Sequence, residues 1–267
     1  MTTSSGSGDL ALVRDMLGAR HRQSPLDLPM DAGAALTPHD GYALQALHAQ
    51  SVLSGLGGRV IGTRIRARDM ASLAALGLGG PMRGPLFSAS AHRSPASLPR
   101  SDHLVCRVEL ALAVRLREEI GGHPYLPGRD VLLHAIGAVL PAIDVIDSRL
   151  TAPEQRPLPL MLADLLYGGA WVHGEPVTDW QDLDLPALKV RLTSGGQEVR
   201  AGTGAPGGVD PLQALSLLVA DLGREGQTLR AGDIVSMGPC TVAYAASAGE
   251  VLRADFGPLG EVELRLT

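Results

Sequence analysis

Helical patterns come first in this chain, and short strand-like runs between turn residues follow. Residues 9–20 place Leu10, Val13 and Leu17 at helical spacing, and a second helical pattern covers residues 38–53. Beyond residue 58 the periodic segments are mostly shorter, and glycine and proline separate them. This order is typical of α+β proteins, in which helices precede a sheet-rich body.

Two places carry local signals of an element boundary. Thr37 and Asp40 have the spacing of a capping box at the start of the second helix. Pro141 separates a helical pattern at 130–139 from a β-branched run at 142–146. We therefore expect the chain to change from helix to strand at this proline.

Several segments favour strands. The run RVIGTRIRA at 59–67 alternates like a short strand, and the valine and leucine density at 103–120 favours a strand, with a helix as the alternative. Residues 81–99 are rich in glycine, proline and serine, which predicts loop and short strand lying over a site.

These patterns predict two units. Residues 1–75 would form a small N-terminal helical or αβ domain, and residues 76–267 a larger mixed body of the β-sandwich or barrel-like kind. One more amphipathic helix, at 211–223, is expected within that body.

Composition excludes several classes of function. The formal net charge is -5 and the 23 basic residues are scattered, so nucleic acid is not an expected partner. No apolar run approaches the roughly 20 residues that span a bilayer. The polar first residues lack the pattern of a secretory signal, so a cytoplasmic protein without a membrane partner is expected. Lys189 is the single lysine.

Cysteine and histidine provide no metal motif. Cys106 and Cys240 lack CxxC spacing and are interpreted as buried thiols. The eight histidines show neither HxxxH nor HxH spacing. His92 and His103 flank the glycine- and proline-rich segment, and we interpret them as surface residues, with an acid or base role as the alternative.

Eight strings, in order between residues 36 and 238, resemble the 2-keto-4-pentenoate hydratase and 4-oxalocrotonate decarboxylase group of the fumarylacetoacetate hydrolase superfamily. They are LTPHDGYALQ, GRVIGTRIRARD, GPLFSAS, CRVELALAV, VLPAIDVIDSRL, AWVHGEPV, DPLQALSLLVADLG and LRAGDIVSMG. The resemblance implies the fold of that superfamily and a homo-oligomer. It also implies a hydratase- or decarboxylase-like lyase that acts on a small 2-oxo or 2-hydroxydienoate acid through an enolate.

The resemblance also implies a metal site. Proteins of this group hold the 2-oxo acid with magnesium or manganese on three carboxylates, two of them in a Glu-x-Glu strand. Here Glu109 stands at the first position, Ala111 replaces the second, and Asp144 matches the third. Glu109 and Asp144 are therefore the predicted metal ligands, and magnesium or manganese is the expected cofactor.

Other positions depart from the group as well. Arg64 stands where the resemblance implies a lysine, Met82 where it implies an acid–base aspartate, and Met237 where it implies a threonine. Arginine does not deprotonate but can clamp a carboxylate, so Arg64 and Glu109 are the predicted catalytic residues. These departures also favour an alternative. The chain would then be a non-catalytic or metal-free homologue that acts as a scaffold, a partner of a homologous enzyme, or an isomerase.

Each candidate also has a structural interpretation. Glu109 could form an ion pair with Arg64 or Arg66, and Asp144 could cap backbone or lie exposed. Arg64, Arg66 and Arg68 alternate on one strand face, where substrate contact is predicted for Arg64 alone. Asp147 is expected at the surface.

Overall fold

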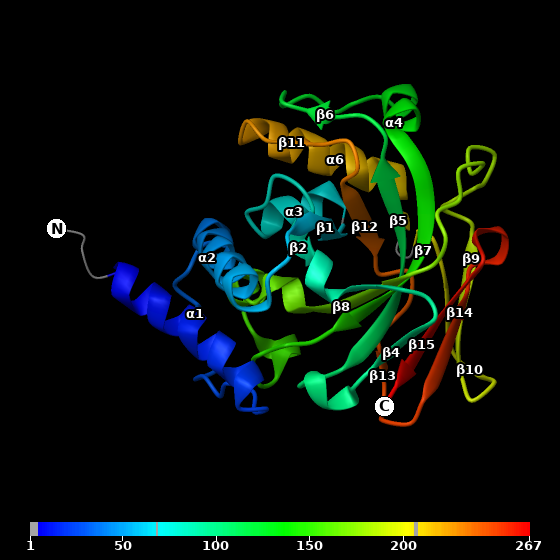
Figure 1. Cartoon of the computed structure of the whole chain (residues 1–267). Helices are drawn as coiled ribbons and strands as arrows, with labels where there is room; N and C mark the ends of the chain where they lie inside the picture. The colour runs from blue at the N-terminus through cyan, green and yellow to red at the C-terminus, as the bar shows by residue number, and fades with distance from the viewer. Residues whose placement is uncertain (1–4, 68, 206–207) are drawn as a thin grey trace.

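The computed structural model describes residues 5–67, 69–205 and 208–267, so Arg68 lies outside the described residues (Figure 1). Its helices are α1 (Ser5–His21), α2 (Pro38–Leu56), α3 (Met70–Ala75), α4 (Arg129–Ala135), α5 (Leu158–Ala163) and α6 (Pro211–Arg224). Its strands are β1 (Val60–Arg66), β2 (Met82–Phe87), β3 (Ala91–Arg93), β4 (Ala96–Leu98), β5 (Arg107–Leu116), β6 (Ile120–Gly121), β7 (Ile136–Ile146), β8 (Gly168–His173), β9 (Lys189–Ser194), β10 (Gln197–Thr203), β11 (Thr228–Leu229), β12 (Ile234–Gly238), β13 (Tyr244–Ala245), β14 (Val251–Asp255) and β15 (Glu261–Leu266). The predicted α+β class is confirmed.

Two sheets form the body. The larger has eight strands in the order β2-β1-β12-β5-β7-β8-β3, with β13 paired to β5, and the smaller has the order β10-β9-β14-β15-β4. Alternate residues of β5, including Val108, Leu110 and Leu112, join a core that also contains residues of the smaller sheet. Because side chains alternate along a strand, Glu109 and Ala111 project from the opposite face of the larger sheet.

The first two helices pack beside this body (Figure 1). The predicted capping box of α2 is confirmed, since the Thr37 side chain accepts from the Asp40 amide at 3.2 Å and the Asp40 carboxylate accepts from the Thr37 amide at 2.8 Å. Val13 of α1 is buried as predicted, whereas Leu10 is 59% exposed, so the predicted apolar face is correct only in part.

Strand β1 joins the two predicted units. It pairs with β2 on one side and runs parallel to β12 on the other, within the larger sheet. Residues on both sides of position 75 therefore share one sheet. The division into 1–75 and 76–267 stays a prediction.

The predicted change from helix to strand at Pro141 is wrong. Helix α4 ends at Ala135, and β7 runs from Ile136 through Pro141. The Pro141 carbonyl accepts from the Gly174 amide at 2.9 Å, just beyond the end of β8. The position of the missing N–H lies on the same side, where pairing with β8 has ended. No hydrogen bond between the two strands is lost there, so the proline is tolerated inside β7.

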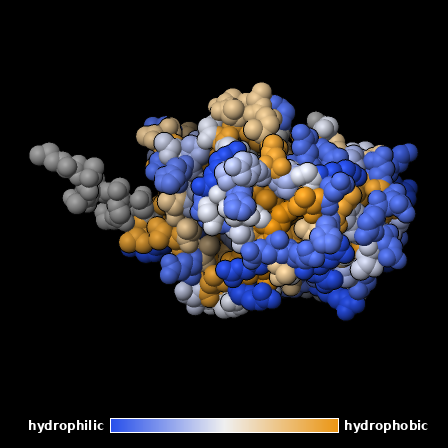
Figure 2. Space-filling model, turned by 90° about the horizontal axis from the view of Figure 1, so that it is seen from above, coloured by the Kyte–Doolittle hydropathy of each residue, from blue (hydrophilic) through white to orange (hydrophobic). Residues whose placement is uncertain are grey.

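Cys106 and Cys240 are buried free thiols, as predicted. In the described part of the chain, no helix is long and apolar enough to cross a membrane. The face seen in Figure 2 is largely hydrophilic, with separate hydrophobic patches.

Candidate functional site

Four charged side chains meet on the face of the larger sheet that points away from the main core. Glu109 of β5 lies opposite Asp144 of β7 in the strand register, and Arg64 and Arg66 come from β1. Arg64 Nη1 lies 2.8 Å from Asp144 Oδ1, and Arg66 Nη2 donates to Glu109 Oε2 at 2.6 Å. We call these four residues the ion-pair cluster.

The ion-pair cluster lines a narrow crevice. Its other lining residues are Ile65, Leu110, Ala111, Leu166, Gly238 and Pro239. The crevice volume is about 10 Å³, which is room for about one water molecule. The structure thus brings the two predicted carboxylates to one place, together with two arginines.

Burial governs the electrostatics of the cluster. Arg64 is 3% exposed, Asp144 7% and Glu109 8%. Burial raises the pKa of both carboxyls, and the guanidinium beside each one opposes that rise. Burial lowers the pKa of Arg64, and the charge of Asp144 opposes it. Two carboxylates and two guanidiniums give the cluster a formal charge of zero.

Part of the hydrogen-bonding capacity of this cluster is unused. Arg64 Nε and Nη1 and Asp144 Oδ1 are buried and have no hydrogen-bond partner among the described residues. Arg64 Nη1 and Asp144 Oδ1 are close but not aligned as donor and acceptor, so their contact is an ion pair without a hydrogen bond. Buried polar groups are usually satisfied, so these atoms can accept a hydrogen-bonding group, a water molecule included, in the crevice.

A tight turn holds Arg64 in position. Residues 165–167 all have positive φ, near 56°, which costs about 1 to 2 kcal/mol for each non-glycine residue. Gly168 follows, and a Cβ there would lie 3.0 Å from Arg64 Cζ. Arg149 pairs with buried Asp164 and donates through Nη1 to the Gly168 carbonyl at 2.8 Å. This buried pair fixes the turn against the Arg64 guanidinium.

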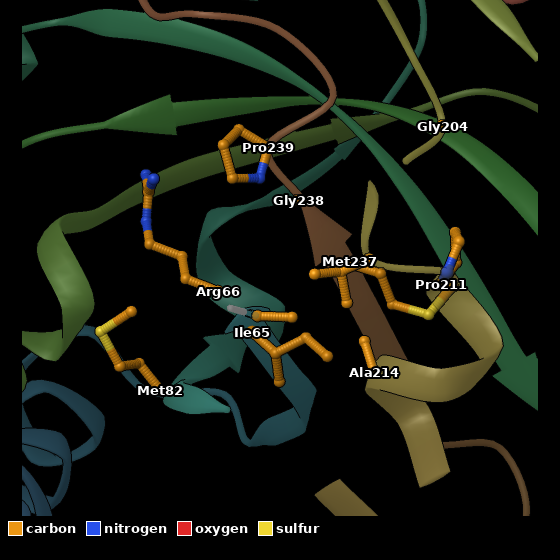
Figure 3. A pocket seen from close by; sticks show the side chains of 11 residues that line it. Ile65, Arg66, Met82, Gly204, Pro211, Ala214, Met237, Gly238 and Pro239 are labelled. Atoms are coloured by element: carbon orange, nitrogen blue, oxygen red, sulfur yellow. The ribbon is translucent and has the colours of Figure 1, made fainter. Parts of the chain in front are cut away.

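A larger cavity adjoins the crevice. We call it the methionine cavity; its volume is about 280 Å³. Figure 3 shows its side chains, which come chiefly from β1, β2, β12 and the start of α6. Its lining residues are Ile65, Arg66, Ala67, Met82, Gly204, Val209, Pro211, Ala214, Met237, Gly238 and Pro239. Among these described residues Arg66 alone carries a charge, so this arginine connects an apolar cavity to the ion-pair cluster.

A second cleft, of about 390 Å³, opens on the other side of Arg66. It contains Arg107, which pairs with Glu154, and Arg156, which donates to the Leu28 carbonyl at 2.9 Å. Its lining carries three arginines against two glutamates, the second being Glu109 of the cluster. The lining therefore carries one formal positive charge in excess, on Arg156, whose guanidinium donates to backbone carbonyls.

The residues present do not fit a resident magnesium or manganese ion. Each carboxylate already has a guanidinium beside it, and Ala111 offers no oxygen. Among the described residues no group of three histidine, cysteine, aspartate or glutamate side chains could hold a metal. The metal role of Glu109 and Asp144 stays a prediction, and this arrangement does not favour it.

Sequence reasoning missed the importance of Arg66. It assigned substrate contact to Arg64 alone, but Arg64 is buried against Asp144, whereas the Arg66 side chain is 24% exposed and lines all three hollows. The available signal was the two-residue period of the strand, which puts both arginines on one face.

Two surface assignments are wrong. Asp147 is fully buried, accepts from the Val105 amide at 2.9 Å and pairs with Arg20 at 3.3 Å. His103 is 8% exposed and its Nδ1 lies 3.7 Å from Asp147 Oδ2, while His92 is partly buried. Strand β7 ends at Ile146, so the alternation used to place Asp147 no longer applies.

Known proteins share this architecture. Residues 84–267 match the family described as fumarylacetoacetate (FAA) hydrolase C-terminal. The 2-keto-4-pentenoate hydratase of Paraburkholderia xenovorans (strain LB400) is 28% identical over 223 residues, which cover 84% of this chain and 81% of the relative. The 4-oxalocrotonate decarboxylase of Pseudomonas putida is 25% identical over 211 residues, or 78% of each chain.

A solved structure agrees over the whole chain. The 4-oxalocrotonate decarboxylase from Pseudomonas putida G7, complexed with magnesium and adipate, has a TM-score of 0.85 at 21% identity and covers 100% of both chains. The predicted fold and the resemblance drawn from the eight strings are confirmed.

Proposed function

This chain belongs to the fumarylacetoacetate hydrolase C-terminal family, and from this premise we propose that it is a lyase. Its substrate would be a small 2-oxo or 2-hydroxydienoate acid, which it hydrates or decarboxylates through an enolate. The names of its relatives support this class, since they include hydratases of such acids and a decarboxylase.

The observation that carries the proposal is the ion-pair cluster at the edge of an apolar cavity. An enolate places negative charge on the 2-oxygen of the acid, and buried donors stabilise such charge strongly. The buried Nε of Arg64, which has no hydrogen-bond partner among the described residues, is a donor of this kind. Burial raises the pKa of Glu109, which favours proton uptake by this carboxylate.

The methionine cavity would receive the rest of the substrate. Met82 and Met237 contribute apolar, flexible walls, and they stand where the resemblance implies an aspartate and a threonine. A substrate with a short hydrocarbon tail suits this cavity. A second carboxylate at the end of that tail would find no charged side chain among the described lining residues other than Arg66.

Magnesium or manganese on Glu109 and Asp144 remains the competing proposal for the cofactor. Solved structures of the decarboxylase are complexed with magnesium or with calcium, which supports a divalent ion in that protein. In this chain the two arginines weigh against the same arrangement.

Turnover tests the proposed function directly. The purified full chain is mixed with 2-hydroxyhexa-2,4-dienoate, the substrate named for one relative, in chelator, in magnesium and in manganese. The dienoate ultraviolet band should disappear faster than without protein in at least one of these buffers. An exposed-arginine variant, Arg93→Met, should match the wild type, because Arg93 pairs only with Glu175 at the surface of the described structure. No acceleration with this or any shorter dienoate would reject the lyase proposal.

A non-catalytic role is the second candidate, and the four departures at Arg64, Met82, Ala111 and Met237 favour it. The chain would then be a scaffold or the partner of an active homologue. We propose a homo-oligomer for either role, and size-exclusion chromatography with light scattering checks it. Tight mixed assembly with a homologous hydratase, combined with absence of turnover, would favour the scaffold.

A further inference from the structure

We propose that the guanidinium groups of Arg64 and Arg66 take the place of a divalent cation in this site, so that the chain binds a 2-oxo acid without metal. The inference rests on the proposed function for its ligand class, but it concerns binding and can be tested without turnover.

Each carboxylate of the ion-pair cluster has one arginine beside it. Arg64 and Arg66 lie two residues apart on β1 and face the two carboxylates, one guanidinium to each. Glu109 and Asp144 are direct neighbours in the β5–β7 register. The two arginines therefore supply the two positive charges that a divalent cation would bring, and arginine stays charged at any physiological pH.

Small residues lie between Arg66 on β1 and Glu109 on β5. Strand β12 lies between them, and Arg66 is paired in register with Gly238 at its end. A Cβ at Gly238 would lie 3.2 Å from the Ala111 Cβ. With glycine at one position and alanine at the other, the Arg66 side chain can cross β12 and reach Glu109. A glutamate at position 111 would project toward the same place, so Ala111 and the Arg66–Glu109 pair belong to one arrangement.

Arg64 keeps a buried donor, Nε, that can bind an oxygen of the acid. Arg64 is buried and lines the crevice; its Nη1 lies against Asp144, and its Nε has no hydrogen-bond partner among the described residues. Arg66 is the more accessible guanidinium and faces the methionine cavity. An acid entering from that cavity would meet Arg66 with its carboxylate and then present its 2-oxygen to Arg64. Planar guanidiniums bind a pair of oxygens in this bidentate manner.

Calorimetry with oxalate, a small dianion with paired oxygens, tests the inference. Titrations are run on the full chain in chelator and in excess magnesium or manganese, and the metals are also titrated alone. Oxalate should bind in chelator, excess metal should lower its apparent affinity only by the share of oxalate that the free metal complexes, and neither metal alone should give stoichiometric heat. Oxalate binding that requires metal, or stoichiometric binding of either metal alone, would overturn the inference.

Variants locate the site. Arg66→Met should weaken oxalate binding roughly tenfold to hundredfold, the range for a lost hydrogen bond to a charged group. Arg93→Met, at an exposed pair, should leave it unchanged. Arg66→Lys keeps the charge but not the planar guanidinium, so its oxalate affinity should lie between those of Arg66→Met and Arg93→Met. It replaces Arg66→Met in the test if the methionine variant does not fold. Equal affinity in all three variants would refute the role of Arg66.

A reconstruction works in the opposite direction. Ala111→Glu combined with Arg66→Ala restores a third carboxylate and removes the competing cation. This double variant should gain stoichiometric manganese binding, read by electron paramagnetic resonance, that the wild type lacks. If oxalate binds in chelator but no dienoate is consumed, the lyase proposal fails and this inference stands. If dienoate is consumed only with metal, the lyase proposal stands and this inference fails.

Discussion

Replacing Arg64 with methionine would remove one partner of a buried ion pair and leave the Asp144 carboxyl without its guanidinium. The two side chains are 4% and 10% exposed and 2.8 Å apart. Removing one partner of such a pair typically costs about 3 to 5 kcal/mol, because the remaining charge is buried and unpaired. The matched control is Arg191→Met, whose pair with Asp255 is 60% and 36% exposed and is screened by solvent, so its loss should destabilise the fold far less.

The assay is urea unfolding followed by circular dichroism at neutral pH. Arg64→Met should lower the unfolding free energy by several times the loss seen in Arg191→Met. The double variant Arg64→Met with Asp144→Leu should recover part of that loss, since both charges are then gone. Equal losses for the two single variants, or no recovery in the double variant, would refute the description of the cluster as a buried charge pair.

Three further perturbations follow from the structure. Burial lowers the pKa of His48 to about 3, so only the unfolded chain binds that proton between pH 6.5 and 3. The free energy of unfolding should therefore decrease by on the order of 5 kcal/mol as the pH falls from 6.5 to 3. An unchanged pH dependence of stability in His48→Gln would contradict this. Gly168→Ala would place a Cβ 3.0 Å from Arg64 Cζ and should weaken oxalate binding about tenfold. The control Gly128→Ala, which has open space around it, should leave oxalate binding unchanged. Equal affinities in the two variants would contradict the role of the turn in positioning Arg64. Gly62→Ala would bring a Cβ within 1.9 Å of a β12 carbonyl, so a melting temperature like that of the wild type would refute the β1–β12 register.

Local signals predicted those parts of the fold that depend on local interactions. The capping box of Thr37 and Asp40 is made by residues three apart, so the start of α2 was visible in the sequence. Asp210 likewise caps α6, by accepting from the Leu212 amide at 2.7 Å. The dense valine and leucine of β5 predicted a buried strand because both of its faces are covered.

The sequence offered Arg64 and Arg66 as ion-pair partners of Glu109, and the pair with Arg66 is observed, but which arginine meets which carboxylate depends on strand order. Arg66 reaches Glu109 only because β12 lies between β1 and β5 and ends in Gly238. Spacing along the chain carries no information about that arrangement. The burial of Asp147 depends in the same way on a turn after β7 that brings it to Arg20 of α1. The sequence therefore indicated which carboxylates matter, and only the structure indicated which cations accompany them.

A crystal grown with both manganese and oxalate, and measured near the manganese absorption edge, tests the arginine site most directly. We expect oxalate on the guanidiniums of Arg64 and Arg66, and no anomalous peak between Glu109 and Asp144. A manganese peak within about 2.2 Å of the two carboxylates, the distance of a coordinated oxygen ligand, would contradict the account.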